Sequence, residues 1–161
     1  MARESRDSER VVDIGLAKEK CMEDPLAEKI FDVIHRKDQR NGELALLIST
    51  GSFAPVHIMH VRMMESARKF ATQQLGYDVV AGILSPSAEA YVEKKLTKHD
   101  CKSTLISNVH RLAMLQLAVQ DTPWPLFVSD WECSQSTVVS FPSVGKAPPF
   151  VLIALPSCHK L

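Results

Sequence analysis

The sequence lacks a surplus of charge of either sign and lacks any long hydrophobic run. Its 19 lysines and arginines balance 19 aspartates and glutamates, so no basic excess supports a dedicated nucleic-acid binder. The longest apolar run, Phe150 to Pro156, is far shorter than the roughly 20 residues that cross a bilayer. No hydrophobic signal core follows the charged N-terminus. We therefore expect an intracellular protein of the nucleus or cytoplasm, with neither nucleic acid nor membrane as a partner.

Cysteines are few, and they are widely spaced. None of them forms a C-x-x-C pair, and they stand at Cys21, Cys101, Cys133 and Cys158. A chain of 161 residues can bury a hydrophobic core without cross-links. We therefore expect reduced thiols rather than disulfides or a zinc site, and no resident metal.

The apolar pattern predicts alternating strands and helices. Short apolar runs predict strands at 44–49, 78–84 and 126–128, and helical spacing predicts helices at 24–40, from the turn after Pro55 to Gly76, and at 108–120. The polar stretch between Pro86 and Ser107 is predicted as a loop. This order is typical of parallel strands joined by right-handed crossovers, with a ligand crevice beyond their carboxyl ends. We predict a three-layer α/β/α fold with a parallel sheet.

Composition divides the chain into three parts. Residues 1–23 are charged and weakly apolar, which indicates a loose N-terminal leader, and residues 24–135 hold the predicted domain. The last 50 residues contain only five of the 38 charged residues but six of the nine prolines. We expect residues 136–161 to form a divergent, disordered tail.

The most informative segment is the sequence TGSFAPVHIMH at residues 50–60, between the first core strand and its helix. Gly51 lets a ligand approach the backbone, Pro55 stiffens the turn, and the free N–H groups of the following helix favour an anion. His57 and His60 stand three residues apart, so both rings can bond one polyphosphate. The P-loop lysine and a third zinc ligand are missing from this segment. We interpret it as a phosphate-binding turn; the alternative is a pair of histidines satisfied by backbone.

The pattern from Gly51 to His60, G-S-F-x-P-x-H-x-x-H, resembles the nucleotidyltransferase signature. The longer string GSFAPVHIMHVRMMESARKF is similar to nicotinamide/nicotinate mononucleotide adenylyltransferases of eukaryotic type. The stretches GILSPSAEAY, HRLAMLQLAV and SDWECSQ follow in that family's order, so the resemblance covers about Leu47 to Gln135. It implies a Rossmann-like nucleotidyltransferase fold. It also implies transfer of AMP from ATP to the mononucleotide, giving NAD or its deamido precursor plus pyrophosphate, with Mg²⁺ accompanying ATP.

The resemblance also implies roles for individual residues. His60, with His57 beside it, would be catalytic and would bind the α- and β-phosphates of ATP. Backbone contacts to the nucleotide would come from Gly51, Ser52 and Phe53.

A second group of residues would bind the mononucleotide. It comprises Ser85, Pro86, Tyr91, Lys94 and Trp131. Where the family usually has Tyr-Lys-Lys-Lys, this chain has Tyr-Val-Glu-Lys-Lys, so the lysine that meets phosphate is Lys94 or Lys95. Arg111 would meet either a ligand or a neighbouring carboxylate.

The resemblance stops after Gln135. The family continues with a helix whose tryptophan packs on the nicotinamide ring, where this chain has Val138, and later with an Ile-Ser-Ser-Thr-x-x-Arg motif that this sequence lacks. The sequence therefore predicts an adenylyltransferase domain with an incomplete C-terminal half. The alternative is a catalytically impaired fragment that keeps a nucleotide-binding half-site and pairs with other subunits, which leaves a homo-oligomer open.

Overall fold

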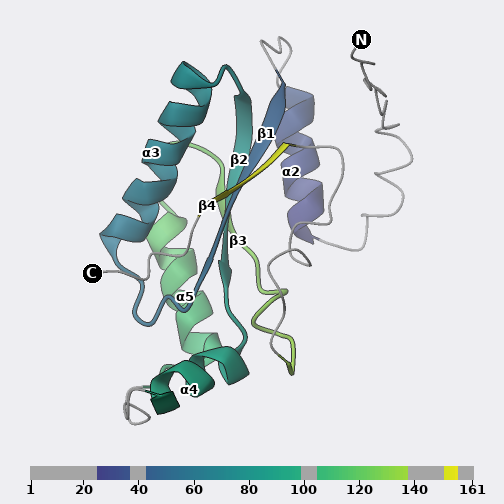
Figure 1. Cartoon of the computed structure of the whole chain (residues 1–161). Helices are drawn as coiled ribbons and strands as arrows, with labels where there is room; N and C mark the ends of the chain where they lie inside the picture. The colour runs from purple at the N-terminus through teal and green to yellow at the C-terminus, as the bar shows by residue number, and fades with distance from the viewer. Residues whose placement is uncertain (1–24, 37–42, 99–104, 138–150, 156–161) are drawn as a thin grey trace, which may run out of the picture.

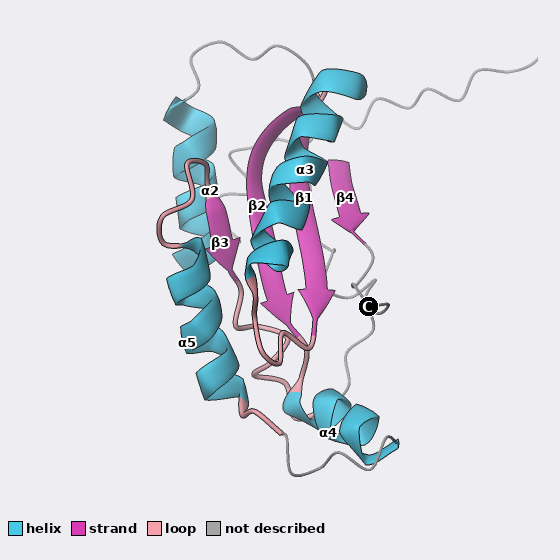
Figure 2. Ribbon diagram, turned by 90° about the vertical axis from the view of Figure 1, so that its left-hand side faces the viewer, coloured by secondary structure: helices cyan, strands magenta, loops and turns pink. Residues whose placement is uncertain are grey.

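The computed structural model describes residues 25–36, 43–98, 105–137 and 151–155. Figure 1 shows the elements in chain order: α2 (Pro25–Arg36), β1 (Leu44–Gly51), α3 (Ile58–Gln74), β2 (Asp78–Pro86), α4 (Glu89–Lys98), α5 (Asn108–Val119), β3 (Leu126–Val128) and β4 (Val151–Leu155). The four described strands form one sheet in the order β3-β2-β1-β4, and every pairing is parallel. Figure 2 shows all four strands running toward the end of the sheet near α4. The predicted α/β fold with a parallel sheet is confirmed.

Helices cover both faces of this sheet, with α2 on one side and α3 on the other (Figure 1). Successive residues of a strand point to opposite faces, so the buried run of β1 supplies two cores. Leu46 and Ile48 pack with the apolar residues of α2, while Ala45 and Leu47 pack with those of α3 and α5. The continuous apolar run is therefore that of a strand covered on both faces.

One predicted loop is a helix. The stretch between Pro86 and Ser107 contains α4, whose first turn carries Glu89 and whose last turn carries Lys95 and Lys98, as the helix dipole favours. The prediction failed because Val92 is the only residue of α4 that is fully buried, so the helix has almost no apolar period. The first predicted helix is present as α2, and its predicted continuation to Arg40 lies outside the described residues.

The predicted disordered tail is wrong at one segment. Residues 151–155 form β4, which pairs with β1 in a register from Ala45↔Val151 to Ser49↔Leu155. The reason is physical: this run is uninterrupted apolar sequence, and it satisfies the backbone of an otherwise open strand edge. The predicted leader at 1–23 and the tail segments 138–150 and 156–161 lie outside the described residues.

Two further observations concern cysteines and membranes. Cys133 is buried and forms no disulfide, as predicted for this residue, whereas the other three cysteines lie outside the described ranges. In the described part of the chain, no helix combines the length and the apolar content needed to span a bilayer.

Candidate functional site: the turn after β1

The turn between β1 and α3 has an unusual backbone. Phe53 has φ +45°, a left-handed conformation that costs energy in residues with a side chain. The residue is nevertheless only 4% exposed and belongs to the core on the α3 side of the sheet. The following Ala54–Pro55 peptide is cis. The turn is therefore held in a defined shape by the burial of the Phe53 ring.

His57 and His60 lie against each other at the start of α3. Their ring centroids are 3.7 Å apart with an interplanar angle of 27°, and the His60 ring meets the edge of Phe53 at 4.9 Å. The backbone N–H of His57 donates to Nδ1 of His60 at 3.1 Å. Because Nδ1 accepts this bond, the neutral His60 ring carries its proton on Nε2. Nε2 is then the hydrogen-bond donor available to an anion.

The environment of His60 favours this neutral form. Burial lowers the pKa of His60, and the charge of His57 lowers it further, against a smaller opposing contribution from the backbone of His57. Without a ligand, His60 is thus a neutral donor rather than a cation. An anion bound at Nε2 would favour the protonated ring.

This lowered pKa predicts a pH dependence of stability. The unfolded chain takes up a proton near the ordinary histidine value of about 6.5, whereas folded His60 takes it up only at lower pH. The free energy of unfolding should therefore fall as pH drops through about 6.5. Urea unfolding between about pH 7.5 and pH 5.5 measures this loss. The slope should be smaller in His60→Asn, whose Oδ1 can still accept the His57 N–H, and equal slopes would contradict the assignment.

A cavity of about 280 Å³ opens at the carboxyl end of β1. Its wall is the whole turn from Ser49 to Pro55, together with His57, His60, Met63 and Lys95. The structure therefore brings together all five residues predicted to bind the nucleotide. The structure adds Lys95 from α4 to this group. Lys95 lines the cavity, whereas Lys94 does not.

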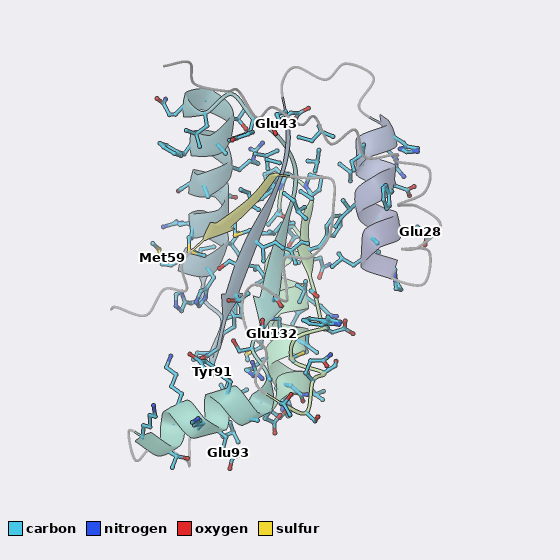
Figure 3. The ribbon with its side chains drawn as sticks, turned by 45° about the vertical axis from the view of Figure 1, so that its right-hand side comes forward. Glu28, Glu43, Met59, Tyr91, Glu93 and Glu132 are labelled. Atoms are coloured by element: carbon cyan, nitrogen blue, oxygen red, sulfur yellow. The ribbon has the colours of Figure 1, made fainter. Side chains whose placement is uncertain are left out.

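A neighbouring cavity of about 280 Å³ runs along α4 and is lined by Tyr91, Lys94, Lys95 and Lys98. Figure 3 shows Tyr91 on the side of α4 that faces the strand ends, whereas Glu93 points away from them. Lys95 lines both cavities and so connects the two predicted groups of residues.

The remaining predicted residues do not line these cavities. The side chains of Ser85 and Pro86 are buried at the end of β2, and neither lines the two cavities on the turn and α4. Trp131, in the loop after β3, is 46% exposed. Their proposed contacts to a mononucleotide remain predictions.

Beneath the turn lies a buried polar cluster that the sequence analysis missed in part. Arg111 in the first turn of α5 has no exposed surface, and its Nη1 donates to the carbonyl oxygen of Ser52 at 3.0 Å. Glu132, 6% exposed, accepts a hydrogen bond from Ser85 Oγ at 3.1 Å. Figure 3 places Glu132 near the strand ends. A buried carboxylate and a buried guanidinium thus support the floor of the site.

Burial controls the ionisation of this cluster. It lowers the pKa of Arg111, which Cys133, Glu89 and Glu132 partly offset. It raises the pKa of Glu132 against opposing effects of Ser85, Ser87 and Arg111. In the sequence, these two charged residues appear as the second members of the pairs HR at 110–111 and WE at 131–132. The sequence does not show which groups they contact in the fold.

The described residues contain no cluster of three or more histidines, cysteines or acids that could hold a metal ion. The turn cavity offers hydroxyls and carbonyls but, within the described ranges, no carboxylate. The groups on this cavity that can bind an anion are the His60 ring and Lys95.

Comparison with known proteins places this site in a family. The chain is 38% identical over 92 residues to "Nicotinamide/nicotinic acid mononucleotide adenylyltransferase 2" of Rattus norvegicus, which covers 57% of this chain and 27% of that protein. It is 36% identical over 91 residues to the protein of that name from Caenorhabditis elegans, covering 56% of this chain and 36% of the relative. It is 38% identical over 92 residues to "Nicotinamide/nicotinic acid mononucleotide adenylyltransferase" of Oryza sativa, covering 57% and 32%.

The matched region is thus about a quarter to a third of the length of these relatives. The predicted resemblance to mononucleotide adenylyltransferases is confirmed. Its predicted extent, from about Leu47 to Gln135, agrees with the 91–92 residues over which these relatives match. The broader cytidylyltransferase-like family model matches residues 48–153 and so extends into β4. By this match, which includes the turn, both histidines, β2, β3 and parts of β1 and β4, the chain belongs to the cytidylyltransferase-like family.

Proposed function

We propose that the protein transfers AMP from ATP to nicotinamide or nicotinate mononucleotide, forming the dinucleotide and pyrophosphate. The observation that carries this proposal is the cavity in which the turn after β1, two stacked histidines and Lys95 converge. It supports phosphate binding because it combines N–H donors, a cation and a helix N-terminus. The similarity to proteins named as mononucleotide adenylyltransferases supplies the substrate class.

In the proposed reaction, the phosphate oxygen of the mononucleotide attacks the α-phosphorus of ATP. A new P–O bond forms there, the bond to the β-phosphate oxygen breaks, and pyrophosphate leaves. No covalent enzyme intermediate is required. His60 Nε2–H and Lys95 would stabilise negative charge on the ATP phosphates, so catalysis consists of positioning and electrostatic stabilisation.

Magnesium would enter as part of the substrate. Mg²⁺ is typically held by one or two carboxylates, waters and substrate phosphates, and no carboxylate of the described residues lines the turn cavity. The described residues therefore do not form a resident magnesium site. In this proposal the ATP phosphates hold the ion, and the chain binds the complex through its N–H groups and Lys95.

Lys95 rather than Lys94 is expected to meet phosphate. Lys95 lines the turn cavity. Lys94 is exposed and lines the cavity along α4 but not the turn cavity. Lys95→Met should weaken ATP binding by roughly tenfold to a hundredfold, which corresponds to one charge-assisted hydrogen bond. Isothermal titration measures this, with Lys69→Met on the exposed side of α3 as the control. A larger loss in Lys94→Met than in Lys95→Met would contradict the assignment.

The direct test is dinucleotide formation from ATP and each mononucleotide, followed by a coupled dehydrogenase assay on the product. Product from both substrates, or from one only, supports the proposal and fixes the preference between nicotinamide and nicotinate. If ATP fails to bind, the proposal is wrong.

A second candidate is nucleotide binding without transfer. The lining of the cavities favours it, because the turn cavity gathers all five predicted nucleotide-binding residues, whereas Ser85, Pro86 and Trp131, predicted for the mononucleotide, line neither cavity. ATP binding without dinucleotide product would select this candidate. Size-exclusion chromatography of the purified chain would then show whether it pairs with further copies.

A further inference from the structure

Arg111 is the most completely buried charge among the described residues. It has no exposed surface, although it stands in the first turn of α5, where a cation is disfavoured by the helix dipole. Only one of its nitrogens, Nη1, has a hydrogen-bond partner in the described structure, the carbonyl oxygen of Ser52. Nε and Nη2 have none. Burying a guanidinium with two unpaired nitrogens costs free energy. Side-chain packing alone therefore does not explain why an arginine stands at this position.

The position of this bond determines the orientation of one peptide group. The Ser52–Phe53 peptide is planar, so its C=O and N–H point in opposite directions. Because Arg111 draws the Ser52 oxygen inward, the Phe53 N–H faces the other side of the turn. Both residues line the cavity, and no described group accepts a hydrogen bond from the Phe53 N–H.

Two features indicate that a further contact must fix the orientation of this peptide. Phe53 has φ +45°, a conformation that persists only where the surroundings enforce it. The Oγ of Ser52 is buried without a partner, so the side chain of Ser52 does not fix the turn. Arg111 is the group that reaches the peptide, from a helix 59 residues further along the chain.

We propose that Arg111 is a positioning residue, which fixes the Ser52–Phe53 peptide so that the Phe53 N–H donates to a nucleotide phosphate in the turn cavity. This inference rests on the proposed function for the identity of the ligand. Arg111 itself touches no substrate, because its guanidinium lies beneath the turn. Its effect on catalysis passes through one backbone donor.

The test uses the full chain labelled with ¹⁵N and three variants. Arg111→Met removes the donor while keeping most of the side-chain volume, and Arg111→Lys keeps the charge with one flexible ammonium group. Leu115→Ala is the matched control, because Leu115 is fully buried one turn later on the same helix and belongs to the core. It destabilises the protein from the same core that holds the Phe53 ring, but it removes no hydrogen bond from the turn.

Amide spectra without nucleotide give the first readout. Arg111→Met should move the Ser52 and Phe53 signals clearly more than Leu115→Ala does, and Arg111→Lys should move them less. ATP titration gives the second readout, in which Arg111→Met should bind at least about tenfold more weakly, the loss expected for one positioned bond to a charged group. Arg111→Lys should recover part of this affinity, and Leu115→Ala should bind as the parent does.

Unchanged Ser52 and Phe53 signals in Arg111→Met would overturn the inference, and so would an equal affinity loss in Leu115→Ala. If ATP shifts other cavity signals of the parent protein but leaves the Phe53 amide unmoved, the inference fails and the proposed function stands. If ATP moves no cavity signal, both fail. Should Arg111→Met not fold, Arg111→Lys against Leu115→Ala decides by the same two readouts.

Discussion

Replacing His60 with alanine is expected to reduce dinucleotide formation by roughly 10²–10³-fold, the usual effect of removing one preorganised donor from a developing charge, worth about 2.7–4 kcal/mol. The structure explains why the effect should be this large. The Nδ1 atom of His60 is occupied by the His57 N–H, so Nε2 presents its proton in a fixed direction. Initial-rate measurements with saturating ATP and mononucleotide give the value.

Two variants separate the donor from the capping bond. His60→Gln can place a side-chain N–H near the position of Nε2 but loses the acceptor for the His57 backbone, whereas His60→Asn keeps that acceptor and loses the donor. Turnover should therefore be better preserved in His60→Gln than in His60→Asn. His35→Ala, at an exposed position of α2 on the other face of the sheet, is the control and should retain full activity. Turnover of His60→Ala within tenfold of the parent protein would remove the assignment.

The turn and the first strands could be predicted because their signals are local. Strand β1 is a continuous apolar run, and Gly76, with φ +75°, ends α3 as a glycine after a helix commonly does. The histidines follow a strand and begin a helix, a position that sequence alone can recognise. Helix α4 carries no comparable signal, since it buries almost nothing. The prediction accordingly left open which of two adjacent lysines reaches the cavity.

Contacts between distant segments were beyond local reasoning. The bond from Arg111 to Ser52 spans 59 residues, and the bond from Ser85 to Glu132 spans 47. In each case the sequence shows a polar residue in an apolar neighbourhood but not its partner. The partners become adjacent only because parallel strands bring their carboxyl ends to one edge of the sheet. The partners of a charge buried at that edge can therefore be identified only once the order of the strands is known.

Close packing is equally invisible in the sequence, and Gly82 shows it most clearly. Gly82 lies within β2 beside Leu126 of β3, in a run that reads simply as a buried strand. A Cβ atom added there would lie 2.5 Å from Trp124 Cη2, 2.8 Å from Leu126 Cδ1 and 2.9 Å from Met64 Cε. The end of Met64 can move, but the Trp124 ring is rigid and buried. Glycine at this position therefore leaves room for the side chains of Trp124 and of Met64 from α3 to pack directly against β2.

Gly82→Ala is expected to destabilise the protein by about 1–3 kcal/mol, the usual cost of overpacking a core. The strand cannot shift away easily, because the Gly82 N–H donates to the Pro125 carbonyl at 2.9 Å. Urea unfolding measures the loss as a lower midpoint with unchanged slope. Gly51→Ala is the matched control for stability, since its added Cβ would meet the Phe53 ring at an ordinary 3.5 Å.

A double-mutant cycle identifies the cause of the destabilisation. Trp124→Phe removes Cη2, the atom that the new methyl group would strike, at the cost of a cavity. If the clash with this ring is responsible, Gly82→Ala should cost less in the Trp124→Phe background than in the parent protein, because contacting residues are energetically coupled. Equal costs in both backgrounds would mean that the methyl group is accommodated by Met64 and Leu126. The loss of stability would then arise from the backbone of β2 rather than from its contact with the Trp124 ring.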